Sequence, residues 1–263
     1  MDAGLSHEQN MANAEPTDMS DSTEPSSNDG GGVAAVDRAL AIANALARTT
    51  TPLTLTELSQ ATGYYKSTLL RLLTSLERAN LVVRRSDRRY ALGSLAFLLG
   101  RAFDASNGLR ENMEPVMHWL VEHGTESPSF HIVHGADLRL CMFRLDSGHS
   151  TLDRVRVGDE LPLRRGAAGK VLLAYAFGTP QFSAESEYIF TSYGERDPLC
   201  GAVAGPVFGP NQMLLGALSL SGPLERFSPA AVERMSALLL TACERATEAM
   251  GGSWPQKGRK PGG

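Results

Sequence analysis

The spacing of apolar residues between positions 33 and 93 predicts three short helices. From residue 36 to 47, apolar side chains recur every three or four positions until a Thr-Thr-Thr-Pro run ends the pattern. Thr54 and Glu57 have the spacing of a capping box, which predicts a second helix that ends at Gly63. In a third helix, from about residue 65 to 79, four leucines share one narrow stripe, so the opposite face presents hydroxyl and guanidinium groups.

Two short β-prone runs follow the third helix and predict a hairpin. They cover residues 81–85 and 88–92, flank a Ser-Asp turn, and place four arginines at the hairpin tip. Three helices, the second and third joined by a glycine turn, and then a basic hairpin have the order of a winged helix-turn-helix.

The rest of the chain predicts a second, mixed domain behind a connecting helix at residues 94–109. Gly-Ala-Asp and Gly-Pro-Asn-Gln segments are typical of hairpin turns between strands. The mixed order of elements predicts an α+β domain with a mainly antiparallel sheet. We expect helices at 113–123, with Pro115 in the first turn, at 167–175 and at 229–250, and strands at 129–133, 138–145, 202–208 and 213–221.

Composition adds two flanking segments to this scheme and gives five parts. The first 32 residues are rich in Ser, Asp, Glu and Gly and predict a disordered acidic arm, and the glycine-rich end predicts a disordered tail. The expected parts are therefore an arm at 1–32, a winged helix-turn-helix at 33–93, a linker helix at 94–109, an α+β domain at 110–250 and a tail at 251–263.

Charge separates the predicted winged helix from the remainder of the protein. The 263-residue chain has a formal net charge of -4, yet residues 33–103 contain ten basic residues against four acidic ones. A basic segment inside an acidic protein is the pattern expected where a polyanion binds. No long apolar run, no secretory signal and no paired cysteine spacing is present, so we expect a cytoplasmic protein without a membrane span.

A series of short motifs runs along the chain between about residues 33 and 250. They are Thr54-Leu-Thr-Glu-Leu58 with Gly63, Lys66-Ser-Thr-Leu-Leu-Arg-Leu-Leu73, Tyr90-Ala-Leu-Gly93, Leu161-Pro-Leu163, Ala167-Ala-Gly-Lys170, Gly194-Glu-Arg-Asp197, Gly205-Pro-Val-Phe208 and Leu218-Ser-Leu-Ser-Gly-Pro223. In their sequence and order they resemble the motifs of the IclR family of bacterial transcriptional regulators. The resemblance implies an N-terminal winged helix, a linker helix and a C-terminal GAF-like domain that binds a small molecule, assembled as a homodimer or tetramer.

The candidate DNA contacts lie on the third helix and on the hairpin. Hydroxyl and guanidinium groups on an exposed helix face can bond phosphates or base edges, and a hairpin tip has no structural need for four like charges. The alternatives are a solvated face and, for Arg71, an ion pair with Glu57. The candidates are Tyr64, Lys66, Ser67, Thr68, Arg71, Arg78, Arg84, Arg85, Arg88 and Arg89.

The candidate ligand contacts belong to the second domain. The segment from Arg165 to Lys170 lacks the spacing of a nucleotide-binding loop, and what remains is a helix N-terminus of small residues that can receive a carboxylate. Ser219 and Ser221 alternate with leucines and so share one strand face. The resemblance implies effector contacts at Leu161, Ala167, Ala168, Ser192, Ala202, Ser219 and Ser221. We further expect apolar walls from Leu161, Leu163, Met142 and Leu199, and a positive potential from Arg164 and Arg165.

The sequence gives less support for a metal site, for catalysis or for a cofactor. His131 and His134 are three apart on a predicted strand and have no third ligand, so we expect no metal site, and we expect no catalytic residue or cofactor. Residues 178–190 form a shorter stretch than the family usually has before Gly194, which leaves the rim of the pocket and Ser192 less defined.

These patterns together predict a ligand-responsive regulator that binds double-stranded DNA at a pseudo-palindromic operator and senses a small organic acid. Two alternatives remain open at this point. One is an enzyme that acts on a small acid and carries a tethered winged helix. The other is a winged-helix dimer that binds no small molecule.

Overall fold

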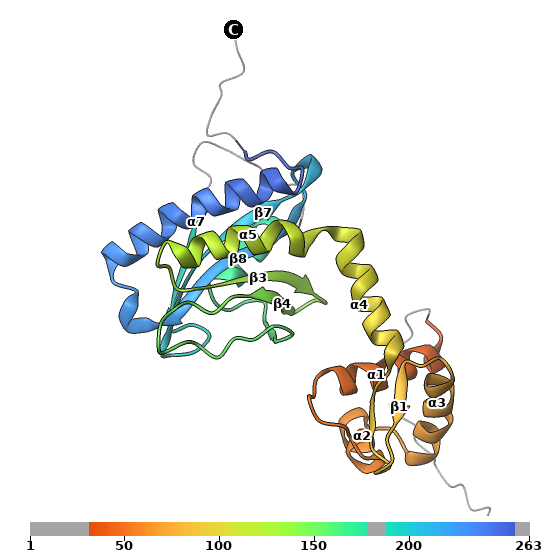
Figure 1. The fold of residues 1–263 in the computed structure, drawn as a ribbon. Helices are drawn as coiled ribbons and strands as arrows, with labels where there is room; N and C mark the ends of the chain where they lie inside the picture. Colours follow the sequence, from red (N-terminus) through yellow and green to blue (C-terminus); the bar gives the residue numbers. More distant parts are fainter. Residues whose placement is uncertain (1–31, 178–187, 256–263) are drawn as a thin grey trace, which may run out of the picture.

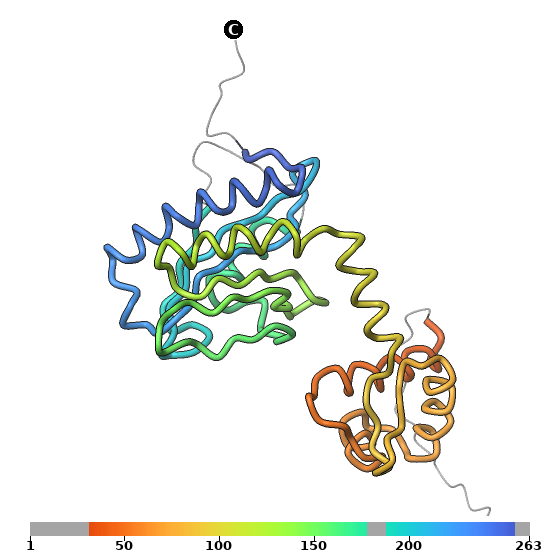
Figure 2. Tube along the Cα trace, in the orientation of Figure 1, coloured from red at the N-terminus to blue at the C-terminus, as the bar shows by residue number. Residues whose placement is uncertain are grey.

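The computed structural model describes residues 32–177 and 188–255 of the chain. They form an N-terminal and a C-terminal body joined by helix α4, Ser94–Asn107 (Figures 1 and 2). The predicted acidic arm lies outside the described residues except for Gly32, and so do residues 178–187 of the shortened segment and residues 256–263 of the tail.

The N-terminal body is a winged helix-turn-helix. Helices α1, Ala34–Ala47, α2, Leu55–Thr62, and α3, Lys66–Arg78, precede the paired strands β1, Val82–Arg84, and β2, Tyr90–Leu92. One face of each helix contributes to a small core, which also includes Val82 and Tyr90 of the two strands. The predicted order of three helices and a hairpin is confirmed.

The capping box predicted at the start of α2 is present. The Thr54 hydroxyl accepts from the Glu57 amide at 3.2 Å, and the Glu57 carboxylate accepts from the Thr54 amide at 2.6 Å. Gly63 then ends α2 with a φ of 74°, a left-handed conformation that glycine adopts without the steric cost of a side chain. These local signals fix the angle between α2 and α3, and therefore which face of α3 is exposed.

A left-handed glycine, Gly108, separates α4 from α5, Leu109–Glu122. The helix predicted from residue 113 therefore begins four residues earlier, and Pro115 lies inside it rather than in its first turn. Proline in a helix interior removes one backbone hydrogen bond. The helix persists because Met113, Met117 and neighbouring apolar residues are buried against the sheet, which offsets that loss.

The C-terminal body is built on a six-stranded antiparallel sheet in the order β5-β4-β3-β8-β7-β6. The predicted α+β class with a mainly antiparallel sheet is confirmed. The strands are β3, Ser127–His134, β4, Leu138–Arg144, β5, Glu160–Pro162, β6, Phe190–Tyr193, β7, Cys200–Phe208, and β8, Leu214–Pro223.

Helices cover both faces of this sheet. Helix α5 and the long α7, Pro229–Ala249, lie side by side on one face (Figure 1). The shorter α6, Ala167–Tyr175, packs on the other face. Successive strand residues point to opposite faces, so Val203 packs under α5 and α7 whereas Ala204 packs under α6.

Two edge strands, β5 and β6, were not predicted from the sequence. Both are only three or four residues long, and each pairs with a single neighbour, β4 or β7. Such short runs have too few residues to show an alternation of apolar and polar positions. They matter for the site because each carries a residue that lines it.

The two bodies touch through one ion pair among the residues that the structure describes. Arg48, at the end of α1, lies 2.7 Å from Glu160 of β5, measured from Nη2 to Oε2. The chain otherwise passes from one body to the other through α4. None of the helices in residues 32–177 and 188–255 is long and apolar enough to cross a membrane.

Helix α6 lies unusually close to the backbone before it, and this contact can be tested. A Cβ atom at Gly169 would lie 2.1 Å from the Leu163 carbonyl oxygen. We expect Gly169→Ala to lower the free energy of unfolding of the C-terminal body by about 1–3 kcal/mol because the helix must move away. Both tryptophans, Trp119 and Trp254, lie in that body, so tryptophan fluorescence in a denaturant titration measures its unfolding.

The matched control is Gly100→Ala in α4, where a Cβ atom meets nothing within 4 Å. This substitution should leave the fluorescence transition of the C-terminal body in place, since alanine also favours a helix. Equal midpoints for Gly169→Ala and the parent protein would contradict the close approach.

Candidate DNA-binding surface and ligand cavity

The exposed end of α3 carries several of the predicted DNA contacts. Lys66, Ser67 and Arg71 are exposed, and Thr68 is half-buried. Tyr64, also predicted, packs against the core of the winged helix. Its neighbour Tyr65 was not predicted, although it precedes the helix directly and is 84% exposed. Tyr65 is therefore the aromatic group that this helix end offers to a partner.

The four arginines of the wing divide into two groups. Arg84, Arg85 and Arg88 are exposed, and Arg88 adopts a φ of 64° at the tip of the hairpin. Arg89 instead lies against the body of the domain, where its Nη1 is 3.2 Å from the Glu57 carboxylate and 3.1 Å from the Pro52 carbonyl oxygen. The sequence left open an ion pair between Glu57 and Arg71. That alternative is wrong, because Glu57 pairs with Arg89 instead.

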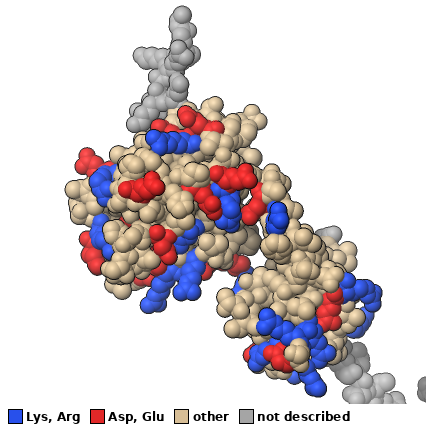
Figure 3. Space-filling model, viewed as in Figure 1, with Lys and Arg blue, Asp and Glu red and all other residues tan. Residues whose placement is uncertain are grey.

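Arg78, the remaining predicted DNA contact, is exposed in the last turn of α3. Lysine and arginine side chains gather on the visible face of the N-terminal body (Figure 3). The structure thus places a helix end with hydroxyl groups beside a basic wing.

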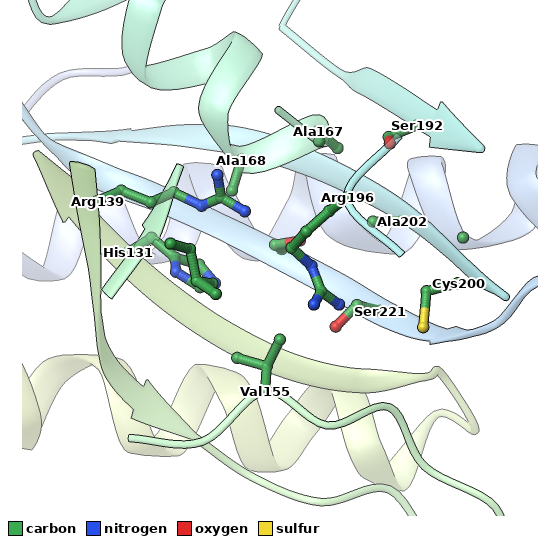
Figure 4. A pocket seen from close by; sticks show the side chains of 14 residues that line it. His131, Arg139, Val155, Ala167, Ala168, Ser192, Arg196, Cys200, Ala202 and Ser221 are labelled. Carbon is green, nitrogen blue, oxygen red and sulfur yellow. The ribbon is translucent and has the colours of Figure 1, made fainter. Parts of the chain in front are cut away.

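The second candidate site is a cavity between α6 and the sheet. All seven residues predicted to contact a ligand line it, from β5, α6, β6, β7 and β8, and that they bind a ligand stays a prediction. Seven more residues complete the lining, namely His131, Arg139, Val155, Gly166, Arg196, Cys200 and Gly201 (Figure 4).

The first turn of α6 offers free backbone amides to this cavity. Gly166 precedes the helix with a φ of 83°, and its amide donates to the Glu195 carboxylate at 3.3 Å. Lys170 in turn lies 2.5 Å from that carboxylate. The amides of Ala167 and Ala168 donate to no acceptor among the described residues, as is usual for a first helical turn, and this end of a helix attracts anions.

Arg139 of β4 is buried beside this helix start. Its side chain reaches from β4 to the turn before α6, and the residue is only 3% exposed. Nη1 donates to the carbonyl oxygens of Pro162 and Arg165, whereas Nε has no partner in the described part of the chain. Burial, and then the charge of Arg196, lower the pKa of Arg139 to about 10, so it is charged at neutral pH, and no carboxylate of the described residues pairs with it.

Two further arginines surround a single buried carboxylate next to the cavity. Asp153, whose side chain is 0% exposed, lies 2.6 Å from Arg144 and 3.3 Å from Arg196. Arg144 also pairs with the exposed Asp146 at 2.9 Å. Arg196 lines the cavity and Arg144 does not, so Asp153 holds Arg196 in place at the cavity wall.

His131 is neutral in this environment. Burial, followed by the charges of Arg139, Arg196 and Arg144, lowers its pKa to about 3. Its Nε2 lies 2.9 Å from the Ser129 hydroxyl, and its Nδ1 has no partner within the described ranges; the same is true of the buried hydroxyl of Ser221. The cavity therefore contains unpartnered hydrogen-bonding groups together with positive charge.

The sequence missed the charged residues of this cavity. Arg139 lies on a predicted strand and Arg196 within a family motif, but nothing in their spacing showed that they meet. Three of the expected apolar walls are wrong: Leu163 is buried in the core under α6, Met142 packs against the core on the α5 side, and Leu199 is 77% exposed.

The positive potential also comes from other residues than expected. Arg164 was predicted to supply it, but its side chain is 77% exposed, and its nearest acid is Asp137 at 3.9 Å. Arg165 contributes its carbonyl oxygen to Arg139 rather than a side chain to the cavity lining.

The cavity is narrow. Its volume is about 30 Å³, enough for one or two water molecules, and arginine side chains take up part of the space between α6 and β8 (Figure 4). A ligand larger than a few atoms must displace Arg196 or the segment that carries Val155. The shape alone thus favours compact ligands.

The described residues contain no cluster of three or more His, Cys, Asp or Glu side chains that could hold a metal ion. The thiol of Cys200 is the only one of the three cysteines at the cavity. Burial raises its pKa, and Asp197 adds to the effect, so Cys200 is not an activated nucleophile.

A winged helix-turn-helix joined to an α+β domain with a polar cavity defines a DNA-binding transcriptional regulator. Residues 35–86 match the model of the IclR helix-turn-helix domain. Together with the relatives described next, this match supports an IclR-family transcriptional regulator.

Sequence similarity to characterised relatives extends over most of the chain. It is 24% identical to the transcriptional repressor IclR of Escherichia coli K12 over 84% of this chain and 92% of that protein. It is 28% identical to the HTH-type transcriptional regulator BhcR of Paracoccus denitrificans over 87% and 90%. The expectation of a regulator rather than an enzyme is confirmed by these relatives.

Solved structures share the fold. An IclR transcriptional regulator of Alicyclobacillus acidocaldarius superimposes with a TM-score of 0.69 at 24% identity, covering 84% of this chain and all of the other. An IclR homologue of Microbacterium hydrocarbonoxydans, solved as a complex with 4-hydroxybenzoate, gives a TM-score of 0.68 at 17% identity, over 82% and 98%. Both therefore share the fold of this chain.

The contribution of the exposed wing arginines can be tested with duplex DNA. Replacing both Arg85 and Arg88 by Ala should weaken binding to any sequence and reduce the slope of log K against log salt by about 0.9 for each phosphate that is no longer neutralised. Fluorescence anisotropy of a labelled random duplex at several salt concentrations measures both quantities.

Arg164→Ala is the matched control, since it removes an arginine that is also exposed, from the other body, and should leave the slope unchanged. If the double variant binds with the affinity and the salt slope of the parent protein, the wing does not contact phosphates.

Proposed function

We propose that this regulator senses a small organic carboxylate in the cavity beneath α6, and that occupancy of the cavity controls DNA binding by the winged helix. The observation that carries the proposal is Arg139. It is a buried guanidinium with no carboxylate partner among the described residues, and it lies beside the free amides of Ala167 and Ala168. A buried, uncompensated charge is costly, and a bound anion offsets that cost.

The chemistry of the lining supports binding rather than turnover. Cys200 has a raised pKa, and His131 makes its one described hydrogen bond with Ser129. A nucleophile needs an adjacent base or a lowered pKa. The ligand should therefore leave the protein unchanged. The complex of the Microbacterium hydrocarbonoxydans homologue with 4-hydroxybenzoate, a carboxylate, agrees with a sensor of organic acids on this fold.

Control of DNA binding follows from a shift between two arrangements of the protein. A ligand that binds one arrangement better favours it, and α4 then passes that preference to the winged helix. The DNA site would be a pseudo-palindrome, since a symmetric pair of winged helices reads two half-sites about 34–36 Å apart or a multiple of that distance. Whether the regulator represses or activates depends on where that site lies.

Exposed apolar side chains support a homodimer or a larger assembly of this chain. Phe97, Leu98 and Leu99 on α4, and Val36 and Leu40 on α1, are all more than half exposed. Monomeric proteins rarely leave so many large apolar groups together in water. A second copy, packed on α1 and α4, would cover them and place two winged helices side by side.

This assembly can be tested by introducing a charge into the exposed apolar face. Leu99→Glu should convert the assembly to monomers or weaken it at least tenfold, because a carboxylate would be buried without a partner. Sedimentation velocity at micromolar concentration gives the mass. Arg164→Gln, an exposed position in the C-terminal body away from α1 and α4, should keep the mass of the parent protein. A parent protein that sediments as a monomer contradicts the proposal.

The ligand site can be tested by filling the start of α6. Ala168 is 3% exposed and lines the cavity, so Ala168→Leu should crowd the amides and abolish the effect of ligand on DNA binding. DNA binding without ligand should survive. The assay is fluorescence anisotropy with DNA from the region upstream of the protein's own gene, with and without a panel of small carboxylic acids.

The matched control is Ala237→Leu on the exposed face of α7, which should respond to ligand as the parent protein does. Recovery of the acid after incubation distinguishes a sensor from an enzyme. If Ala168→Leu still responds, or if the parent protein consumes the acid, the proposed site or the proposed function is wrong.

A further inference from the structure

The cavity contains two separate groups of hydrogen-bond donors. The first group lies at the start of α6 and consists of the amides of Ala167 and Ala168 and the guanidinium of Arg139. The second group lies toward β8, where the guanidinium of Arg196 points at the hydroxyl of Ser221 (Figure 4). A ligand with a single carboxylate can satisfy only one group at a time.

Some N–H groups of the Arg196 guanidinium remain available to donate hydrogen bonds to a ligand. Its Nη2 is 3.3 Å from Asp153, and its side chain also interacts with the thiol of Cys200. The other N–H groups of this guanidinium donate to no acceptor in the described ranges, and the side chain, 20% exposed, lines the cavity. The hydroxyl of Ser221, a residue that is only 6% exposed, has no partner there either. Together they form a second place for a negatively charged oxygen.

The charges around the cavity do not cancel. Arg144 and Arg196 share one buried carboxylate, Asp153, and Arg139 has no carboxylate partner among the described residues. The second acid that pairs with Arg144, Asp146, has a side chain that is 62% exposed. Lys170 and Glu195 form an ion pair near the N-terminal end of α6, so their charges cancel. Excess positive charge therefore remains at both groups of donors, which favours a ligand with more than one negative charge.

We propose that the effector is a short aliphatic dicarboxylate. One carboxylate binds the amides of Ala167 and Ala168 beside Arg139, and the other binds Arg196 and Ser221. This proposal rests on the proposed function, because it specifies the acid sensed at the same cavity. Arg196 is then the residue that selects dicarboxylates over monocarboxylates.

The size of the cavity agrees with a short aliphatic chain. A volume of about 30 Å³ must widen for any dicarboxylate, and Arg196 lies in the segment between β6 and β7 rather than on a strand. The segment between β4 and β5 that carries Val155 has no regular secondary structure and forms one wall. An aromatic acid would require a much larger displacement of the lining.

Matched pairs of acids with equal chain length provide the test. Isothermal titration calorimetry at low ionic strength would compare malonate with propionate, succinate with butyrate, and glutarate with valerate on the full-length protein. The parent protein should bind at least one dicarboxylate roughly ten- to hundredfold more tightly than its partner, as expected for an added hydrogen-bonded ion pair. Alkylation of Cys200, which lies at the same end of the cavity, should slow when that dicarboxylate is present.

Arg196→Gln should lose this preference and bind the dicarboxylate only as tightly as the monocarboxylate. Ser221→Ala should reduce the preference for the dicarboxylate by a few-fold. Because it leaves the pair between Arg196 and Asp153 intact, it provides the test if Arg196→Gln fails to fold. The control is Arg164→Gln, which removes the same charge from the same body outside the cavity and should keep the full preference.

The outcomes separate the two proposals. Equal binding of both acids by the parent protein, or an undiminished preference in Arg196→Gln and Ser221→Ala, overturns the dicarboxylate proposal and leaves a carboxylate sensor. Binding of neither acid contradicts both the dicarboxylate proposal and the carboxylate sensor.

Discussion

The guanidinium of Arg139 links the central sheet to the start of helix α6, and the shape of the cavity depends on this link. From β4 it donates to the carbonyl oxygens of Pro162 and Arg165, which bracket the turn before α6. Gly169 allows α6 to lie close enough for this contact, since its position has no room for a Cβ atom. The same arrangement buries a positive charge beside free helix amides. A structural contact and an affinity for anions thus arise from one side chain.

The link between the cavity and the winged helix is weaker. Arg48 and Glu160 form the described ion pair between the two bodies, and Glu160 directly precedes Leu161, which lines the cavity. The Arg48 side chain is 64% exposed, and exposed pairs contribute about 0–1 kcal/mol. A shift of β5 can therefore bias the winged helix only slightly within one chain. If two chains associate through α4 and α1 as proposed, movement of one chain relative to the other gives a larger response.

Local patterns in the sequence predicted most of the fold. The capping box at Thr54, the glycine after α2 and the leucine stripe of α3 depend on neighbouring residues, so their effect can be deduced from spacing alone. All seven residues predicted to contact a ligand meet at one cavity. Their common location follows from a family resemblance, which transfers positions together with their relative places in the fold, and that they bind a ligand stays a prediction.

The charges of the cavity could not be predicted in the same way. Arg139, Asp153 and Arg196 come from β4, a loop and the segment after β6, and they meet only because the sheet places β4 and β7 on either side of β3 and β8. Arg89 is a similar case, because its ion pair with Glu57 joins residues 32 positions apart. Pairings between distant segments depend on tertiary structure and leave no periodic signal in the sequence.

The most direct test of a carboxylate sensor beneath α6 is a crystal structure of the protein with its tightest-binding acid. The account predicts carboxylate oxygens within about 2.7–3.1 Å of the amides of Ala167 and Ala168. Density for the acid in the apolar groove between Phe103 of α4 and Met213, or density for a chemically altered acid in the cavity, would contradict it.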